Sequence, residues 1–231
     1  KAIICTLLLM PLLLTCTTDV EPVENDNTAP TGDLNASLAP DEEPRGLRIK
    51  TDGAFPAYTL FAPLTGDTTY LIDIDGKVVR TWKSEVSNSS WVYMLDNGNV
   101  IRGGDAPGDS EFNGGAQGGR IQEWDLDGRL VWDFTYNTEN RLPHHDVAIL
   151  PNGNVLAIAW ERKSPDEARQ AGRREDLLPE RGVWPGMLIE FEPQRPNGAR
   201  IVWEWHSFDH LIQNVDATLD NYGEPSEHPE K

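Results

Sequence analysis

The feature that most constrains the fold is a hairpin-like segment that recurs along the body of the chain. Copies run over residues 70–82, 121–134 and 188–205, and each contains two apolar segments separated by a turn. The turn carries Asp-Gly in the first two copies and Asn-Gly in the third. Both dipeptides accept the positive φ angles of tight turns, so each copy predicts two antiparallel strands. Recurrence at intervals of about 50 residues is typical of arrays of small structural units.

A second hairpin accompanies the first in two of the repeats. Residues 94–101 and 149–156 both place Asn-Gly-Asn between apolar segments. Two hairpins give four strands per repeat, which is the composition of one blade of a β-propeller. About three such units fit into residues 55–213, whereas propellers usually contain about four to eight blades. We therefore expect an all-β chain that forms about three blades of a β-propeller. Either a partner closes the ring or the chain stops before the ring is complete, and we favour the second.

One segment departs from the strand pattern. Ser164 and Glu167 have the spacing of a capping box, with Pro165 at the first helical position, so we expect a short helical insertion over residues 165–174. The basic side chains in and around this segment are Arg162, Lys163, Arg169, Arg173, Arg174 and Arg181. Such a group is usually a solvated surface, but it could also form a basic rim over a cleft that receives an anion.

The N-terminal region predicts export. Residues 1–16 combine a short apolar run with Leu-Leu-Thr-Cys, which resembles a lipobox in which Cys16 is lipidated; an ordinary secretory signal is the alternative. Residues 17–50 are acidic and rich in proline, so we expect a disordered linker, followed by the propeller portion over residues 51–231. We expect an exported periplasmic or cell-envelope lipoprotein that meets the membrane only through this anchor.

The charge of the whole chain limits its partners. Its formal net charge is −18 at pH 7, which would repel a phosphate backbone. We therefore expect no nucleic-acid partner. Both cysteines lie in the N-terminal apolar segment, so we expect no disulfide in the body of the protein.

Four of the five histidines lie in two clusters near the ends of predicted strands. The first cluster is His144, His145 and Asp146; the second is His206, Asp209 and His210. Because both follow equivalent repeats, we expect them to open at the same end of their blades and to face one place. Structural histidines, a metal site and a cofactor-free transfer site are the three interpretations. Adjacent strand residues face opposite sides, so only one of the paired histidines is expected to point inward.

Three segments together resemble the bacterial arylsulfotransferases of the aryl-sulfate sulfotransferase type. They are residues 118–134, 144–156 and 203–213, in which His-His-Asp and Trp-His-x-x-Asp-His are the most specific motifs. Residues 221–223 and 228–230 continue the resemblance. The resemblance implies a six-bladed periplasmic propeller, of which this chain would be an N-terminal portion.

The resemblance also implies a reaction. Such enzymes transfer a sulfuryl group from a phenolic sulfate ester to another phenol, through a sulfated histidine, without a nucleotide donor, cofactor or metal. It implies that His144 or His145 supports the sulfate and that Asp146 orients one of them. The second cluster would line the substrate or be structural. The nucleophilic histidine, an arginine and a His-x-Asn motif are expected beyond residue 231, so we expect this fragment alone to be inactive.

The expected partners are small phenolic sulfate donors and phenol acceptors, accommodated by Trp160, Trp184 and Trp205. Two alternatives stay open. One is a non-catalytic propeller displayed at the cell surface that binds a glycan, peptide or protein, since a fold alone does not define an activity. The other is a metal-dependent hydrolase that uses the first histidine cluster.

Overall fold

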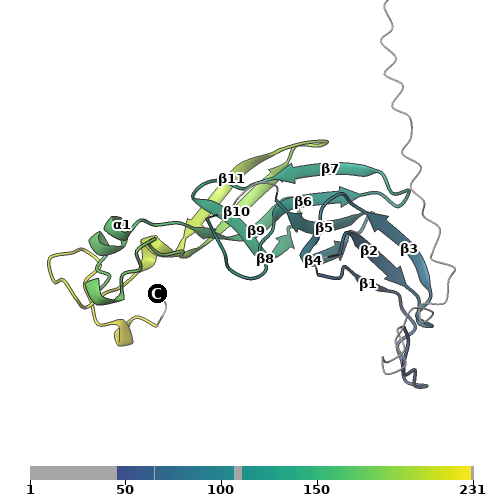
Figure 1. Ribbon diagram of the computed structural model, residues 1–231, viewed down its shortest axis with the longest axis horizontal. Helices are drawn as coiled ribbons and strands as arrows, with labels where there is room; N and C mark the ends of the chain where they lie inside the picture. Colours follow the sequence, from purple (N-terminus) through teal and green to yellow (C-terminus); the bar gives the residue numbers. More distant parts are fainter. Residues whose placement is uncertain (1–45, 65, 107–110, 230–231) are drawn as a thin grey trace, which may run out of the picture.

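The computed structural model describes residues 46–64, 66–106 and 111–229. The predicted signal peptide, Cys16 and most of the predicted linker lie outside the described residues. The described part of the chain is mostly strand, and its strands form three antiparallel sheets (Figure 1). The strands are β1 (Thr59–Phe61), β2 (Thr68–Ile72), β3 (Val78–Lys83), β4 (Asn88–Met94), β5 (Val100–Asp105), β6 (Gly119–Trp124), β7 (Leu130–Thr135), β8 (Arg141–Ile149), β9 (Val155–Glu161), β10 (Gly186–Pro193) and β11 (Ala199–His206).

Each sheet follows the order of the sequence. The sheets are β1-β2-β3, β4-β5-β6-β7 and β8-β9-β10-β11, with every strand paired to its neighbour in the chain. The all-β prediction is confirmed, and the second and third sheets have the four strands expected of a repeat. The three sheets do not close into a ring. β4 packs along β8 and also contacts β1, so the first strand of each sheet lies on the same side of the array.

The predicted Asn-Gly turns join strands as expected. Gly98 has φ +86° and Gly153 has φ +83°, values that glycine adopts without steric cost. At each turn the asparagine before the glycine accepts a hydrogen bond from the backbone N–H two residues later, at 2.9 Å for Asn97 and 3.0 Å for Asn152. These local bonds fix the register of β4 with β5 and of β8 with β9.

Tryptophan side chains connect successive sheets. Trp82 at the end of the first sheet donates its indole N–H to the backbone oxygen of Asp125, at 2.9 Å, in the second sheet's turn. Trp132 of the second sheet donates to the backbone oxygen of Gly198, at 2.8 Å, in the third sheet's turn. Both rings are fully buried, and Phe191 packs in the same core as Trp132. The aromatic residue of each of these repeats therefore anchors the repeat that follows it.

The outermost strand of the third sheet has an exposed apolar surface. Ile201, Trp203 and Trp205 lie on β11, and Trp203 is 45% exposed. Within the described part of the chain, no further sheet packs against this strand. Trp132 in the second sheet is buried because the third sheet packs against it, whereas Trp203 is exposed. Among the described residues, the stacking of sheets therefore ends at the third sheet.

A buried arginine holds the middle sheet together. Arg102 on β5 is 0% exposed and donates to the side-chain oxygen of Gln122, at 2.8 Å from Nη2, and to the side-chain oxygen of Asn88. It also donates to the backbone oxygen of Val86 at 3.1 Å. Burial lowers the pKa of Arg102 to about 10, which leaves it charged at neutral pH. This guanidinium links the segment before β4 with β4, β5 and β6.

The predicted insertion lies between β9 and β10. Its helix α1 (Pro165–Gln170) begins at a complete capping box formed by Ser164 and Glu167, which confirms that prediction. The helix ends at Gln170 rather than at residue 174, because Gly172 turns the backbone into the left-handed region at φ +90°. Short 3-10 helices follow: η1 (Glu175–Leu177), η2 (Ser207–His210) and η3 (Pro225–Glu227). No helix among the described residues is long and apolar enough to cross a bilayer.

Candidate active site

A bulge in β8 brings the two histidines of the first cluster together. The pairing of β8 with β9 shifts register between Pro143 and Val147, and His145 has φ +59°. This left-handed conformation is uncommon for a residue with a side chain. It interrupts the alternation of faces along the strand, so the two rings contact each other although His144 is buried and His145 is exposed. The Nδ1 atoms of His144 and His145 are 2.7 Å apart, with the ring planes at 84°.

Two neighbouring segments hold the bulge. The backbone N–H of His145 donates to the backbone oxygen of Ala116, at 2.9 Å, in the loop between β5 and β6. The Ser90 hydroxyl on β4 donates to the backbone oxygen of His145. Gln117 forms a bridge with His144. A strained residue held by several contacts is typical of functional sites.

His144 is the buried member of the pair. It is 8% exposed and stacks on Trp160 of β9, with ring centroids 4.2 Å apart. Its Nε2 atom is buried and has no hydrogen-bond partner among the described residues. Burial, and next the neighbouring His145, lower the pKa of His144 to about 4. At neutral pH this imidazole is therefore neutral, and the short contact between the Nδ1 atoms has one donor and one acceptor.

Asp146 contacts the neighbouring sheet rather than the imidazoles. It accepts a hydrogen bond from the Tyr93 hydroxyl on β4 at 2.7 Å and another from the backbone N–H of Val147 at 2.8 Å. The bond from Tyr93 to the carboxylate, together with burial, raises the pKa of the Tyr93 hydroxyl. Among the described residues, the Asp146 carboxylate makes no hydrogen bond with either histidine ring. Asp146 thus links the second and third sheets, and that it orients one of the imidazoles stays a prediction.

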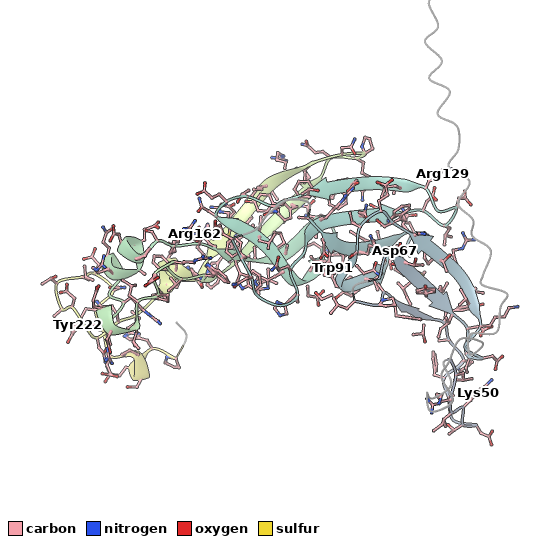
Figure 2. The ribbon with its side chains drawn as sticks, in the orientation of Figure 1. Lys50, Asp67, Trp91, Arg129, Arg162 and Tyr222 are labelled. Atoms are coloured by element: carbon pink, nitrogen blue, oxygen red, sulfur yellow. The ribbon has the colours of Figure 1, made fainter. Side chains whose placement is uncertain are left out.

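A cavity lies beside Asp146. It has a volume of about 330 Å³ and is formed by the start of the first sheet, by β4 and by Asp146. Its aromatic walls are Phe61, Trp91 and Tyr93, and Figure 2 labels Trp91. The rings of Trp91 and Tyr93 stack with centroids 6.0 Å apart. The size and lining suit a small ring compound.

Two of the three tryptophans expected at the site lie together beside His144. Trp160 and Trp184 have ring centroids 6.0 Å apart, and Phe112 lies 5.9 Å from Trp160 and 5.2 Å from Trp184. Gly114 allows the chain to pass close to the Trp160 ring, since a Cβ at this position would lie 2.4 Å from that ring. This aromatic cluster fixes the ring on which His144 stacks.

The second histidine cluster lies at the opposite edge of the third sheet. His206 on β11 pairs with Met187 of β10, which is level with Ala159 of β9 and Pro143 of β8. Three strand spacings of about 4.8 Å separate the two edges by about 14 Å. The two clusters therefore lie at the same end of the sheet but at opposite edges. The sequence had led us to expect that they would face one place, and they do not.

The residues of the second cluster have structural partners. His206 contacts Glu161 through Nδ1 at 3.0 Å and Glu204 through Nε2 at 3.5 Å. His210 stacks on Trp205, with ring centroids 5.0 Å apart. Asp209 is exposed in η2. Trp205 thus belongs to this cluster and not to the aromatic wall near His144.

Most of the basic side chains around the insertion are neutralised by acidic neighbours. Arg169 pairs with Asp166 and Glu175, and Arg174 pairs with Asp176. At the start of the insertion, Lys163 pairs with Glu161 at 3.2 Å and Arg162 lies 4.0 Å from Glu139. These ion pairs compensate most of the positive charge of the basic rim that the sequence suggested over a cleft. Of this group, Arg173 and Arg174 do line a cleft.

Ser90, Tyr93 and Phe112 were not identified from the sequence. They come from other segments, and Tyr93 lies 53 residues before the carboxylate that it contacts. Among the described residues, no group of three or more histidine, cysteine, aspartate or glutamate side chains is placed to hold a metal ion. Comparison of the sequence with protein-family models and with curated proteins found no match.

Proposed function

We propose that this chain takes part in transferring a sulfuryl group from a phenolic sulfate ester to another phenol, without a nucleotide. In this proposal the His144–His145 pair holds the sulfate, and the three sheets belong to a β-propeller. The observation that carries it is the convergence of two imidazoles on a strained bulge beside an aromatic wall. The resemblance of the His-His-Asp and Trp-His-x-x-Asp-His segments to arylsulfotransferases supports the choice of reaction.

The chemistry of sulfuryl transfer suits this pair. The S–O bond to the donor phenol breaks, an S–N bond forms to a histidine, and the departing phenolate takes a proton. The S–N bond then breaks as the acceptor phenol loses its proton and forms the new ester bond. Such a transfer needs positioning and charge stabilisation of the sulfate oxygens. We assign His145 to donating a hydrogen bond to a sulfate oxygen, with His144 fixing the ring of His145; the nucleophile is assigned to neither.

The cavity beside Asp146 supports a phenolic substrate. Its aromatic walls would pack against the ring of the donor or acceptor, while the sulfate faces the bulge. Asp146 lines the cavity and also follows His145 directly in the chain, so the two subsites would be adjacent. Tyr93 keeps the Asp146 carboxylate on the cavity wall through its hydroxyl.

The test measures binding and turnover separately. Binding of 4-nitrophenyl sulfate to the chain is measured by calorimetry, and His145→Gln should weaken it about tenfold because a donor to a charged oxygen is lost. His210→Gln is the matched control and should bind like the wild type. In the intact protein, 4-nitrophenol release should require an added phenol and no nucleotide, and His145→Gln should slow it by about 10²–10³. Wild-type binding by His145→Gln, or release that does not need the acceptor phenol, contradicts the proposal.

One observation favours the binding-module alternative. The exposed Ile201, Trp203 and Trp205 on β11 form an apolar surface that could receive a protein or glycan partner. A binding module requires no transfer of the sulfuryl group. Binding of a macromolecule that is lost in Trp203→Ser, together with the absence of phenol-dependent turnover, would favour it.

The exported, lipid-anchored location belongs to the same proposal. Cys16 would carry the lipid, and residues 17–50 would separate the anchor from the folded sheets. Metabolic labelling with a radioactive fatty acid tests it. Incorporation should be lost in Cys16→Ser, and equal labelling of the variant would contradict the assignment.

A further inference from the structure

A second cavity lies away from the histidine pair, between the insertion and the segment that follows β11. Its volume is about 470 Å³. Its walls come from the segment of α1 and η1 and from Phe208 and residues 211–215, and Trp184 and Pro185 also line it. In Figure 1 these segments form the end of the molecule opposite β1–β3, and Figure 2 labels Tyr222 there.

Specific polar contacts fix the conformation of one wall of this cavity. Gln213 is 8% exposed, and its amide nitrogen donates to the Asp216 backbone oxygen at 2.9 Å and the Asn221 side-chain oxygen at 3.0 Å. Its amide oxygen accepts from the backbone N–H groups of Val215 at 2.8 Å and Asp216 at 2.9 Å. All four hydrogen-bonding positions of this side chain are thus occupied. A buried amide with full pairing fixes its segment in one conformation.

The same segment is attached directly to the end of α1. A Cβ at Gly172 would lie 2.3 Å from the side chain of Gln213, so the two segments touch closely. The Asn221 amide donates to the backbone oxygen of Ala171 at 3.0 Å. The cavity is therefore built into the fold by contacts between segments about 40–50 residues apart in the chain, and it does not need a ligand to form.

The walls combine an apolar body with positive charge. Trp184, Phe208, Leu211 and Ile212 supply apolar surface, and no aspartate or glutamate is among the described residues that line the cavity. The chain as a whole has 38 acidic and 20 basic residues, so a cavity wall without a carboxylate is a place where an anion meets less repulsion. The Lys163 ammonium, which pairs with Glu161, lies over the Phe208 ring, 5.1 Å from its centre, and holds that ring in place.

Arg173 is the charged side chain available to a ligand. Its Nε donates to the backbone oxygen of Leu177 at 3.2 Å, which orients the guanidinium. Among the described residues, its two terminal nitrogens have no carboxylate partner. Arg174 also lines the cavity but is held by Asp176 through two bonds, at 3.0 Å and 2.6 Å. Within the part of the chain that the structure describes, Arg173 therefore differs from its neighbour in that both terminal nitrogens lack a carboxylate partner.

We propose that this cavity binds an organic anion with an aromatic body, whose acidic group pairs with the terminal nitrogens of Arg173. The ring packs between Trp184 and Phe208, and the acidic group lies at the exposed side where Arg173 is. The planar guanidinium suits a carboxylate, sulfonate or sulfate group. This site is separate from the histidine pair and does not depend on the proposed sulfuryl transfer.

The test uses naphthalene-2-sulfonate as the probe. Its binding to the chain is followed by the fluorescence of Trp184, identified as the signal that disappears in Trp184→Phe. Three companion compounds separate the contributions: naphthalene-2-carboxylate changes the acidic group, 2-naphthalenemethanol removes the charge, and methanesulfonate removes the ring. Both naphthalene anions should bind, the neutral alcohol should bind about tenfold more weakly, and methanesulfonate should not be detected.

Two matched variants assign the site. Arg173→Gln should weaken binding of naphthalene-2-sulfonate about tenfold, whereas Arg181→Gln, in the same insertion but outside the cavity wall, should leave it unchanged. Because Arg173 is exposed, the unfolding midpoint of its variant should match the wild type, which separates binding from folding. His145→Gln should also bind normally.

Three outcomes would overturn the proposal. They are equal affinity for the neutral alcohol, wild-type affinity in Arg173→Gln, and loss of binding in His145→Gln. The last outcome would place the anion at the histidine pair. The sulfuryl-transfer proposal is judged by the phenol-dependent release of 4-nitrophenol, which this test does not measure, so failure of the present proposal leaves that one unaffected.

Discussion

The low pKa of His144 predicts that the protein loses stability in mild acid through this one side chain. Its imidazole is buried against Trp160, and its pKa falls from the ordinary 6.5 to about 4. In the native state it therefore binds a proton less readily than in the unfolded chain. The contribution is complete above pH 6.5, where both states hold a neutral ring, and is lost as the pH falls from 6.5 towards 4.

The size of this effect follows from the two pKa values. Linkage gives a loss of about 2 kcal/mol at pH 5 and about 3 kcal/mol at pH 4, relative to pH 7. The variant His144→Phe keeps a ring for Trp160 to stack on and removes the titrating group. It should differ from the wild type by about 1 kcal/mol or less at pH 7, since one hydrogen bond to His145 is lost.

The assay is urea unfolding at pH 7, 5.5, 5 and 4 for the wild type and His144→Phe. As the pH decreases from 7, the free energy of unfolding of the wild type should decrease more than that of the variant. The extra decrease should be about 2 kcal/mol at pH 5 and about 3 kcal/mol at pH 4. His210→Phe, which removes an exposed histidine, is the control and should keep the wild-type pH dependence because His144 is intact. Parallel curves for the wild type and His144→Phe would refute the reasoning.

Three further predictions concern contacts that build the site. Asp146→Asn should lower the pKa of Tyr93 towards its usual value of 10, because the carboxylate that raises it is gone; titration of the tyrosinate absorbance measures this, and an unchanged pKa would contradict the contact. Arg102→Met should reduce the free energy of unfolding by about 3 kcal/mol, since it leaves buried amide oxygens without a donor, and urea unfolding checks it. Gly114→Ala should lower the free energy of unfolding by about 1–3 kcal/mol, because the new Cβ meets the Trp160 ring. The same variant should raise the pKa of His144 measured by NMR. A variant as stable as the wild type would count against this packing.

The parts of the fold that could be predicted from the sequence are those determined locally. The turns at Gly98 and Gly153 depend on asparagine and glycine within the turn itself, so they appear where the sequence places them. The start of α1 depends on Ser164 and Glu167, which are three residues apart. The helix α1 ends earlier than predicted because the backbone enters the left-handed region at Gly172, which is a common way for a helix to end.

The geometry of the site depends on contacts that no local pattern contains. The positive φ of His145 is held by Ala116 and Ser90, which belong to other segments. Without that bulge, strand alternation separates the two histidines, and this is why the sequence predicted only one to face inward. The position of His206 was misjudged for a related reason: equivalent ends of repeats were assumed to converge, whereas β8 and β11 are opposite edges of one sheet.

The most direct test of the central claim, that the His144–His145 pair holds the sulfate of an aryl sulfate ester, is an NMR titration. Imidazole ¹H–¹⁵N spectra of the chain are recorded while 4-nitrophenyl sulfate is added, with the histidine signals assigned from single variants. The account predicts saturable shifts at His144 and His145, with His206 and His210 unchanged. Saturable shifts confined to His206 and His210, or no shift at any histidine, would contradict it.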